Sequence, residues 1–191
     1  MSSILLTPPA VEPVTLADAK AYLRVAIDDD DAVIAALISA ARSHIEAQTK
    51  RALITQTWRL IRDCWPPDGR IAVVPAPLRS VAAARVYDAG GSAHAIDTGV
   101  FVADKAAAPA VLSFVPWTLT EPGRATAGVE IDVEVGYGGA PANVPESLRQ
   151  ALLLLVAHWY ENRGMIAIGQ TVAVLPMAVA ALIAPYRVFS L

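Results

Sequence analysis

The hydrophobic pattern of this 191-residue chain is helical towards both ends and strand-like between them. A period of about 3.6 residues runs through a first apolar stripe, which consists of Ile34, Leu37, Ile38, Ala41 and Ile45. Residues 55–138 instead hold short runs rich in β-forming residues, separated by Pro and Gly. Helical periodicity returns after residue 143. This alternation restricts the chain to folds in which strands are inserted between helices.

The predicted fold class is therefore α+β, a helical bundle with an inserted small antiparallel β domain. Residues 1–54 are expected to form an N-terminal helical part and residues 55–140 the β domain. Residues 141–191 are expected to supply C-terminal helices and an extended tail. The two helical parts should pack together as one core, because each has an apolar stripe to bury.

The run "GVEIDVEVGYGG" is the clearest predicted strand. Its valine and isoleucine side chains alternate with acidic ones, so one face is expected to be buried. The other face is expected to be exposed to water or to a partner. Its acidic side chains are Glu130, Asp132 and Glu134.

Capping residues mark where the helices are expected to begin. Thr15 is a natural N-cap, and Asp18 lies where a carboxylate favours the first turn of a helix. Asn143 and Glu146 have the spacing of a second capping pair. The acidic run Asp28–Asp31 precedes the first apolar stripe and lacks the spacing of a calcium-binding loop. Helix capping and the helix dipole explain this run.

The composition indicates that partners cover part of the surface. Hydrophobic residues make up 55% of the chain, charged residues make up 17%, and the mean hydropathy is +0.46. These values are apolar for a monomer whose whole surface faces water. The formal charge of −3 gives no support for non-specific DNA binding. The single Cys64 excludes an internal disulfide and fits a reducing compartment.

Neither a membrane span nor a signal peptide is predicted. Residues 164–186 contain no charged side chain, and their number would suffice for a span. The segment 169–171 and then Pro176 divide this run into pieces shorter than a bilayer, so we expect it to be buried in protein. The N-terminus lacks the basic start and the long apolar core of a signal peptide.

The sequence contains no recognisable catalytic motif. His44, His94 and His158 lie on separate predicted elements, and none has a second ligand at metal-binding spacing. A nucleophile elbow, a phosphate-binding loop and a dinucleotide fingerprint are all missing. Cys64 lies beside Trp65 in a β-rich run, where packing explains it better than nucleophilic chemistry. We therefore predict a protein that is not an enzyme and that needs no cofactor or metal.

The segment "LLLLVAHWYENRG", residues 152–164, combines an apolar run with a polar end. On a helix, Trp159 points with the apolar stripe, while Tyr160 and Arg163 lie at its edge. Two interpretations remain open, a core helix whose polar end is solvated and an interaction surface. Trp, Tyr and Arg are the residue types that dominate interface hot spots. The second interpretation predicts a subunit interface at Trp159, Tyr160 and Arg163.

Four segments of the chain stand in a characteristic order: "PVTLADAKAYLRV", "DDDDAVIAALISAARSHIEAQTKRAL", "QTWRL…CWP" and "VPESLRQALLLLVAHWYENR". In this order they resemble the head–tail connector, or adaptor, family of long-tailed bacteriophages, which also occurs in gene transfer agents. The most specific pieces are "TLADAKAYLRV" and "AHWYENR". The resemblance extends to about Arg163 and is less distinctive beyond it.

The resemblance implies a structural role. Members of the family form a ring, commonly twelve-fold, beneath the portal protein of a DNA-filled head. The ring joins the portal to the next neck protein, the stopper, and extends a channel through which DNA passes without specific binding. The implied location is the neck of a virion or gene transfer agent particle, after assembly in the bacterial cytoplasm. The alternatives are a small module that recruits a partner through its β domain, and an enzyme with an unrecognised site.

The C-terminal tail is expected to bind the portal. After Pro185 it contains no Gly or Asp to form a turn, so it can extend along a strand edge or groove of a neighbour. The expected portal-binding residues are Tyr186, Arg187, Val188, Phe189 and Leu191. The alternative is that the tail folds back on its own helices. The candidates for a channel wall that repels DNA are the acidic strand face and Asp28–Asp31.

Overall fold

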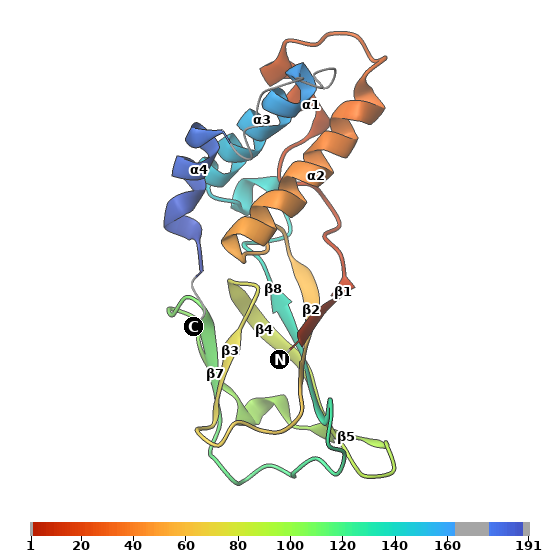
Figure 1. The fold of residues 1–191 in the computed structure, drawn as a ribbon, viewed down its shortest axis with the longest axis vertical. Coiled ribbons are helices and arrows are strands. Elements are labelled where there is room, and N and C mark those ends of the chain that lie inside the picture. The colour runs from red at the N-terminus through yellow and green to blue at the C-terminus, as the bar shows by residue number, and fades with distance from the viewer. Residues whose placement is uncertain (1, 163–175, 189–191) are drawn as a thin grey trace, which may run out of the picture. The chain divides into compact units, whose positions relative to one another are not determined.

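The computed structural model describes residues 2–162 and 176–188, which form two compact units. The helical unit draws its residues from Ala10–Ile54 and Gly138–Arg187. The β unit draws its residues from Met1–Pro9, Thr55–Tyr137 and Val188–Leu191. Figure 1 shows the helices in one unit and the strands in the other. The first nine residues therefore belong with the strands, although the sequence pattern assigned them to the N-terminal helical part.

The helical unit contains four α-helices within the described residues. They are α1 (Leu16–Leu23), α2 (Asp31–Thr49), α3 (Glu146–Glu161) and α4 (Met177–Ile183). Short 3-10 turns, η2 (Pro141–Asn143) and η3 (Ala184–Tyr186), precede α3 and follow α4. Helices α2 and α3 are the long ones, with 19 and 16 residues. None of the helices in the described ranges is long and apolar enough to cross a membrane, and most of the segment 164–186 lies outside these ranges.

The start of α1 follows the predicted capping pattern. The Thr15 hydroxyl accepts a hydrogen bond from the Asp18 backbone N–H at 3.1 Å, and the Asp18 carboxylate accepts one from the Thr15 N–H at 3.3 Å. This reciprocal capping box satisfies donors that the first helical turn would otherwise leave unpaired. Helix α1 ends at Leu23, and the next residue, Arg24, caps it with a left-handed backbone whose φ is 57°.

The predicted capping pair before α3 is wrong. Pro145 is the residue that precedes the helix, and no side chain caps it. The Asn143 side chain instead accepts a hydrogen bond from the Ala140 N–H at 3.0 Å, within the preceding turn. Pro145 fits this position because its fixed φ suits a helix start and it lacks the N–H that a cap would serve.

The core of the helical unit lies between the inner faces of its helices. In α2, the fully buried positions repeat every three or four residues, as one face of a helix requires. Leu37 and Trp159, both expected in the apolar stripes, are only half-buried. The buried positions of the two long helices are Ile34, Ile38, Ala41, Ile45 and Thr49 in α2, and Leu148, Ala151, Leu152, Leu153, Leu155 and Val156 in α3.

The β unit contains two antiparallel sheets rather than one. The order of the five-stranded sheet is β1 (Ser2–Thr7), β2 (Gln56–Arg62), β8 (Val129–Val135), β4 (Leu78–Tyr87) and β5 (Ala93–Ile96). The order of the three-stranded sheet is β3 (Arg70–Val73), β7 (Ala110–Ser113) and β6 (Val102–Asp104). The 3-10 turn η1 (Thr98–Val100) connects β5 to β6. Strand β1 was not expected from the sequence.

Strand β8 lies at the centre of the five-stranded sheet, between β2 and β4. Its Val129, Ile131, Val133 and Val135 side chains are fully buried, as their alternation predicted. Ile71 and Leu112 of the three-stranded sheet are fully buried as well, so both sheets contribute to the core of this unit.

An aromatic cluster closes one part of the β-unit core. Trp65, Phe101 and Phe114 lie with ring centroids 5.3–6.1 Å apart, in the tilted and edge-on geometries that aromatic rings favour. The turn before β3 brings Gly69 close to the backbone oxygen of Phe114, where a Cβ atom would be only 2.3 Å away. With a φ of 66°, that position requires glycine.

The α+β class predicted from the sequence is confirmed. The described helices are two long ones and two short ones, so the structure does not specifically support the finer description as a helical bundle. The strands lie between helices in the sequence, except for β1, which precedes them all.

Candidate assembly surfaces

The end of α3 carries the predicted subunit-interface residues. The ring of Trp159 packs edge-on against His44 of α2, with centroids 5.9 Å apart and an interplanar angle of 83°. The Tyr160 hydroxyl donates a hydrogen bond to the carboxylate of Asp30, just before α2. Both side chains are half-buried. They therefore fasten α3 to α2 within the chain, while Arg163 lies outside the described residues.

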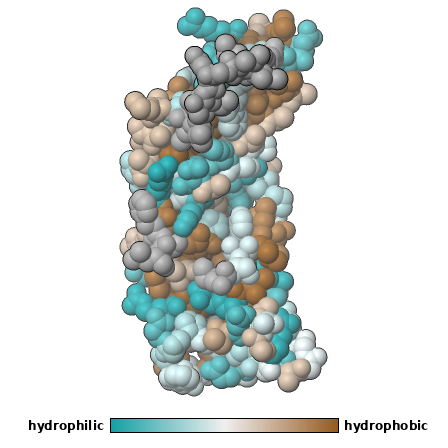
Figure 2. Space-filling model, viewed as in Figure 1, coloured by the Kyte–Doolittle hydropathy of each residue, from teal (hydrophilic) through white to brown (hydrophobic). Residues whose placement is uncertain are grey.

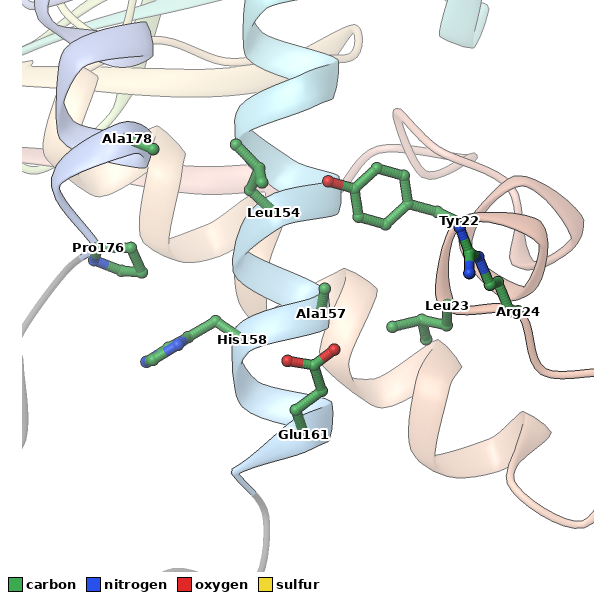
Figure 3. A pocket seen from close by; sticks show the side chains of 9 residues that line it. All are labelled: Tyr22, Leu23, Arg24, Leu154, Ala157, His158, Glu161, Pro176 and Ala178. Atoms are coloured by element: carbon green, nitrogen blue, oxygen red, sulfur yellow. The ribbon is translucent and has the colours of Figure 1, made fainter.

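A cavity of about 510 Å³ lies beside these residues, between α1, α3 and the start of α4. Figure 3 shows the Tyr22 hydroxyl pointing towards α3, with His158 on the side nearer Pro176. Charged groups at the rim are Arg24 and Glu161. The complete lining is Tyr22, Leu23, Arg24, Leu154, Ala157, His158, Glu161, Pro176 and Ala178.

The cavity lacks the convergent groups of a catalytic site. The described contacts of His158 are with Asn162, whose side-chain nitrogen lies 3.4 Å from its Nδ1 atom. A second hollow of about 220 Å³, in the β unit, is lined in part by Asp88 and His94, whose exposed side chains lie 3.0 Å apart, within hydrogen-bonding distance. Cys64 is exposed and free. Within residues 2–162 and 176–188, no group of three or more His, Cys, Asp and Glu side chains could hold a metal ion.

The acidic run before α2 is partly neutralised within the chain. The Lys20 ammonium lies 2.6 Å from carboxylate oxygens of both Asp28 and Asp31. The hydrogen bond from Lys20 to Asp28 is the largest cause that raises the pKa of Lys20, and the hydrogen bond to Asp31 raises it further. Asp30 precedes the helix but makes no side-chain capping hydrogen bond and accepts from Tyr160 instead. Pairing with side chains of α1 and α3 therefore accounts for this run better than capping.

The sequence predicted that the acidic face of β8 is exposed, and this prediction is wrong for two of its three residues. Glu130 and Asp132 are only 9% and 7% exposed. The reason lies on the neighbouring strands, where arginines face these carboxylates. Arg59 of β2 binds Asp132 through two hydrogen bonds of 2.7 and 3.0 Å, and Arg85 of β4 binds it at 2.6 Å. These two carboxylates are thus internal ion-pair partners that are largely covered within the chain.

The same network extends across the sheet. Arg59 and Arg85 each lie 3.2 Å from Glu130, which also accepts a hydrogen bond of 2.9 Å from the Tyr87 hydroxyl. Burial opposes ionisation of Asp132, but the hydrogen bond from Arg59 and the charge of Arg85 outweigh it and lower its pKa. The hydrogen bond to Asp132 in turn raises the pKa of Arg59. The network therefore joins side chains of three neighbouring strands, in addition to their backbone pairing and the apolar core.

The base of the C-terminal tail is attached to α2 and to Arg51, two residues beyond its end. The Arg51 Nε atom donates a 2.6 Å hydrogen bond to the Tyr186 carbonyl oxygen, and the Arg187 guanidinium lies 3.4 Å from the Gln48 side-chain oxygen. Val188 is only 4% exposed. Of the predicted portal-binding residues, Phe189 and Leu191 lie outside the described residues. The described part of the tail is therefore occupied by contacts within its own chain.

Two apolar patches on the β unit were missed by the sequence analysis. The β1 patch consists of Ile4, Leu5 and Leu6, which are 46%, 44% and 39% exposed. Figure 2 shows hydrophobic residues at the surface along β1. The Val102 patch consists of Val102, Val115 and Trp117, which are 71%, 68% and 80% exposed. The only sequence signal was the uncharged run "SSILLT" before Pro8 for the first patch, and "VPW" for the second.

The comparisons with known proteins point to particle assembly. A family model described as head completion protein matches residues 12–189. A comparison with curated proteins found no match.

Solved structures match over both units. A chain in the neck of an empty gene transfer agent particle, computed with C6 symmetry, superimposes with a TM-score of 0.82 at 26% identity. A chain in the virion of the native gene transfer agent particle gives 0.83 at 26% identity. Each match covers 100% of this chain and 97% of the other. A chain in the native neck, computed with C12 symmetry, gives 0.74 at 28% identity, covering 98% of this chain and 97% of that one.

Proposed function

Because the chain belongs to the head completion protein family, we propose that it forms a ring under the portal of a phage-like particle. Its general role is structural, in joining a head to a tail, and the predicted resemblance to the head–tail connector family of phages and gene transfer agents is confirmed. In detail, we propose a twelve-fold ring that binds the portal on one side and the stopper on the other. The ring extends the channel by which DNA leaves the head, and the protein resides in the particle neck.

The observation that carries this proposal is a likeness that spans the whole chain. It covers the helical unit and the β unit together, and the similar chains come from particle necks with cyclic symmetry. A fold shared over one unit would support only a common domain. The exposed apolar patches of the β unit add a physical reason, since surfaces of this kind are normally covered by other subunits.

The acidic run before α2 and Glu134 remain candidates for the channel wall. The Asp28 side chain is 88% exposed despite its ion pair with Lys20, and that of Glu134 is 38% exposed, whereas Glu130 and Asp132 are largely buried. A wall of this charge repels DNA at short range and keeps the channel free of tight binding. The subunit interface at Trp159, Tyr160 and Arg163 remains part of the proposal. The contacts of Trp159 with His44 and of Tyr160 with Asp30 would position the end of α3 for it.

The experiment that tests the ring is electron microscopy of particles from cells with and without the intact gene. We expect heads and tails to remain separate without the protein, and density for a closed ring of this fold in the neck when it is present. Normal particles made in its absence, or a neck with only one or two copies, would contradict the proposal.

The tail is proposed as the portal anchor, with the described contacts at its base as the fixed point. Arg51 and Gln48 bind residues 186 and 187, so the deletion that tests the anchor is placed beyond Val188. Deleting residues 189–191 should leave a folded subunit that no longer joins heads to tails. The matched control is Met177→Ala, at an exposed side chain of α4 that is not among the expected portal-binding residues. Normal assembly by the truncated protein would exclude the tail as the anchor.

A further inference from the structure

The two apolar patches of the β unit are separate surfaces formed by different sheets. The β1 patch lies on the edge strand of the five-stranded sheet, and β6, which carries Val102, is the edge strand of the three-stranded sheet. Figure 1 shows β1 on the opposite side of the β unit from β7, the strand that pairs with β6. The β unit therefore presents apolar side chains on two opposite sides.

The Val102 patch borders the aromatic cluster along the chain. Val102 of β6 pairs with Ser113 of β7, and Val115 lies two residues beyond the end of β7; both valines are exposed. Their chain neighbours Phe101 and Phe114 are buried and pack edge-on against each other in the aromatic cluster. Trp117 follows with a φ of 65°, a backbone conformation that few non-glycine residues adopt. The chain thus leaves a large aromatic side chain 80% exposed, two residues after the exposed Val115.

The β1 patch lacks the features that normally protect an edge strand. Residues 2–7 contain no charged side chain and no proline, and all six are exposed. Monomeric proteins usually guard such an edge with a lysine, a proline or a covering loop, because an open edge pairs readily with other chains. The patch is therefore suited to contact with another subunit.

We propose that the β1 patch of one copy docks on the Val102 patch of the next copy, and that this contact closes the ring. The inference rests on the proposed function. In a cyclic ring every subunit uses two different surfaces, one for each neighbour, and these must complement each other. Two uncharged apolar patches on opposite sides of one unit meet that requirement. Contact between two β1 patches would stop at a dimer and would leave the Val102 patch exposed.

Cross-linking in assembled particles tests the contact directly. The variant carries Leu5→Cys and Val102→Cys, together with Cys64→Ser to remove the exposed native thiol. After mild oxidation of purified particles, we expect a ladder of covalent oligomers. Each single-cysteine variant should stay monomeric, because the contact joins unlike patches. The control pair Leu5→Cys with Met177→Cys uses a position on α4 that is more accessible than Val102, and it should also stay monomeric.

Charge exchange provides a second measurement that does not depend on disulfide geometry. Leu5→Lys and Val102→Glu should each lower the yield of joined particles about tenfold or more, because each buries an unpaired charge in the contact. The two changes in one chain should restore the yield to within about threefold, since unlike charges then meet between neighbours. Met177→Lys, at a side chain that is 88% exposed, should have no effect. All variants should keep their melting temperature, because the altered side chains are exposed.

The outcomes separate this inference from the proposed function. A neck ring that forms normally with both single charge variants, and that gives no ladder from the double-cysteine chain, overturns the contact but keeps the ring. A dimer from Leu5→Cys alone also overturns it, by indicating contact between like patches. Particles whose necks lack the protein altogether overturn both proposals.

Discussion

Replacing Asp132 with asparagine should lower the free energy of unfolding by about 2–4 kcal/mol. The carboxylate is 7% exposed and accepts three hydrogen bonds of 2.6–3.0 Å from Arg59 and Arg85. Removing one partner of a buried ion pair costs roughly 3–5 kcal/mol, because the remaining charge is left uncompensated. The arginine side chains are 22% and 24% exposed, so water screens part of that loss. Asparagine also retains one oxygen that can accept a hydrogen bond.

The assay is equilibrium urea unfolding at neutral pH, followed by far-ultraviolet circular dichroism. Glu134→Gln is the matched control on the same strand, because its carboxylate is 38% exposed and lies 3.7 Å from an arginine that is 43% exposed. This control should change the free energy of unfolding by less than about 0.5 kcal/mol. Equal effects of the two variants would refute the argument that burial makes the Asp132 network important for stability.

Four further predictions follow from the described contacts. The folded-state pKa of Asp132 lies below its ordinary value of 3.8, so its contribution is complete above that pH and is lost as the pH falls through the folded-state value. As the pH falls below about 3.8, the free energy of unfolding should therefore decrease more steeply for the wild type than for Asp132→Asn. Tyr160→Phe removes the hydrogen bond to Asp30 and should cost about 1 kcal/mol by urea unfolding; no loss would mean that the bond is not formed in solution. Thr15→Ala removes the α1 cap and should cost about 1 kcal/mol, whereas Thr118→Ala on an exposed loop should cost little. The purified protein should show no tight, salt-sensitive DNA binding in fluorescence anisotropy, and such binding would contradict the repulsive channel wall.

Local patterns were sufficient for several elements because their causes lie within a few residues along the chain. The capping box of Thr15 and Asp18 spans one helical turn, and the alternation in residues 129–135 places successive side chains on opposite faces. The long helices follow from apolar spacing for the same reason. The signals for these features lie within the local sequence, so sequence alone predicted them.

The sequence also indicated residue types without revealing their partners. Trp159 and Tyr160 were identified as candidate interface residues from their chemistry, and the structure places them against His44 and Asp30. The partner of Tyr160 lies 130 residues away in the sequence. No spacing rule reaches that far, so the choice between an internal contact and an external surface could not be made from local pattern.

What only the tertiary structure decided is which surfaces are covered. Alternation predicted an acidic face on β8, but Arg59 and Arg85 reach Asp132 across separations of 73 and 47 residues and convert that face into a buried network. The run "SSILLT" contains too few residues for its periodicity to define an element, and it becomes a strand because β2 offers it a free edge. Exposure of the β1 and Val102 patches likewise depends on which strands end each sheet. Local sequence sets how a segment prefers to fold, whereas burial depends on distant segments that only the folded chain brings together.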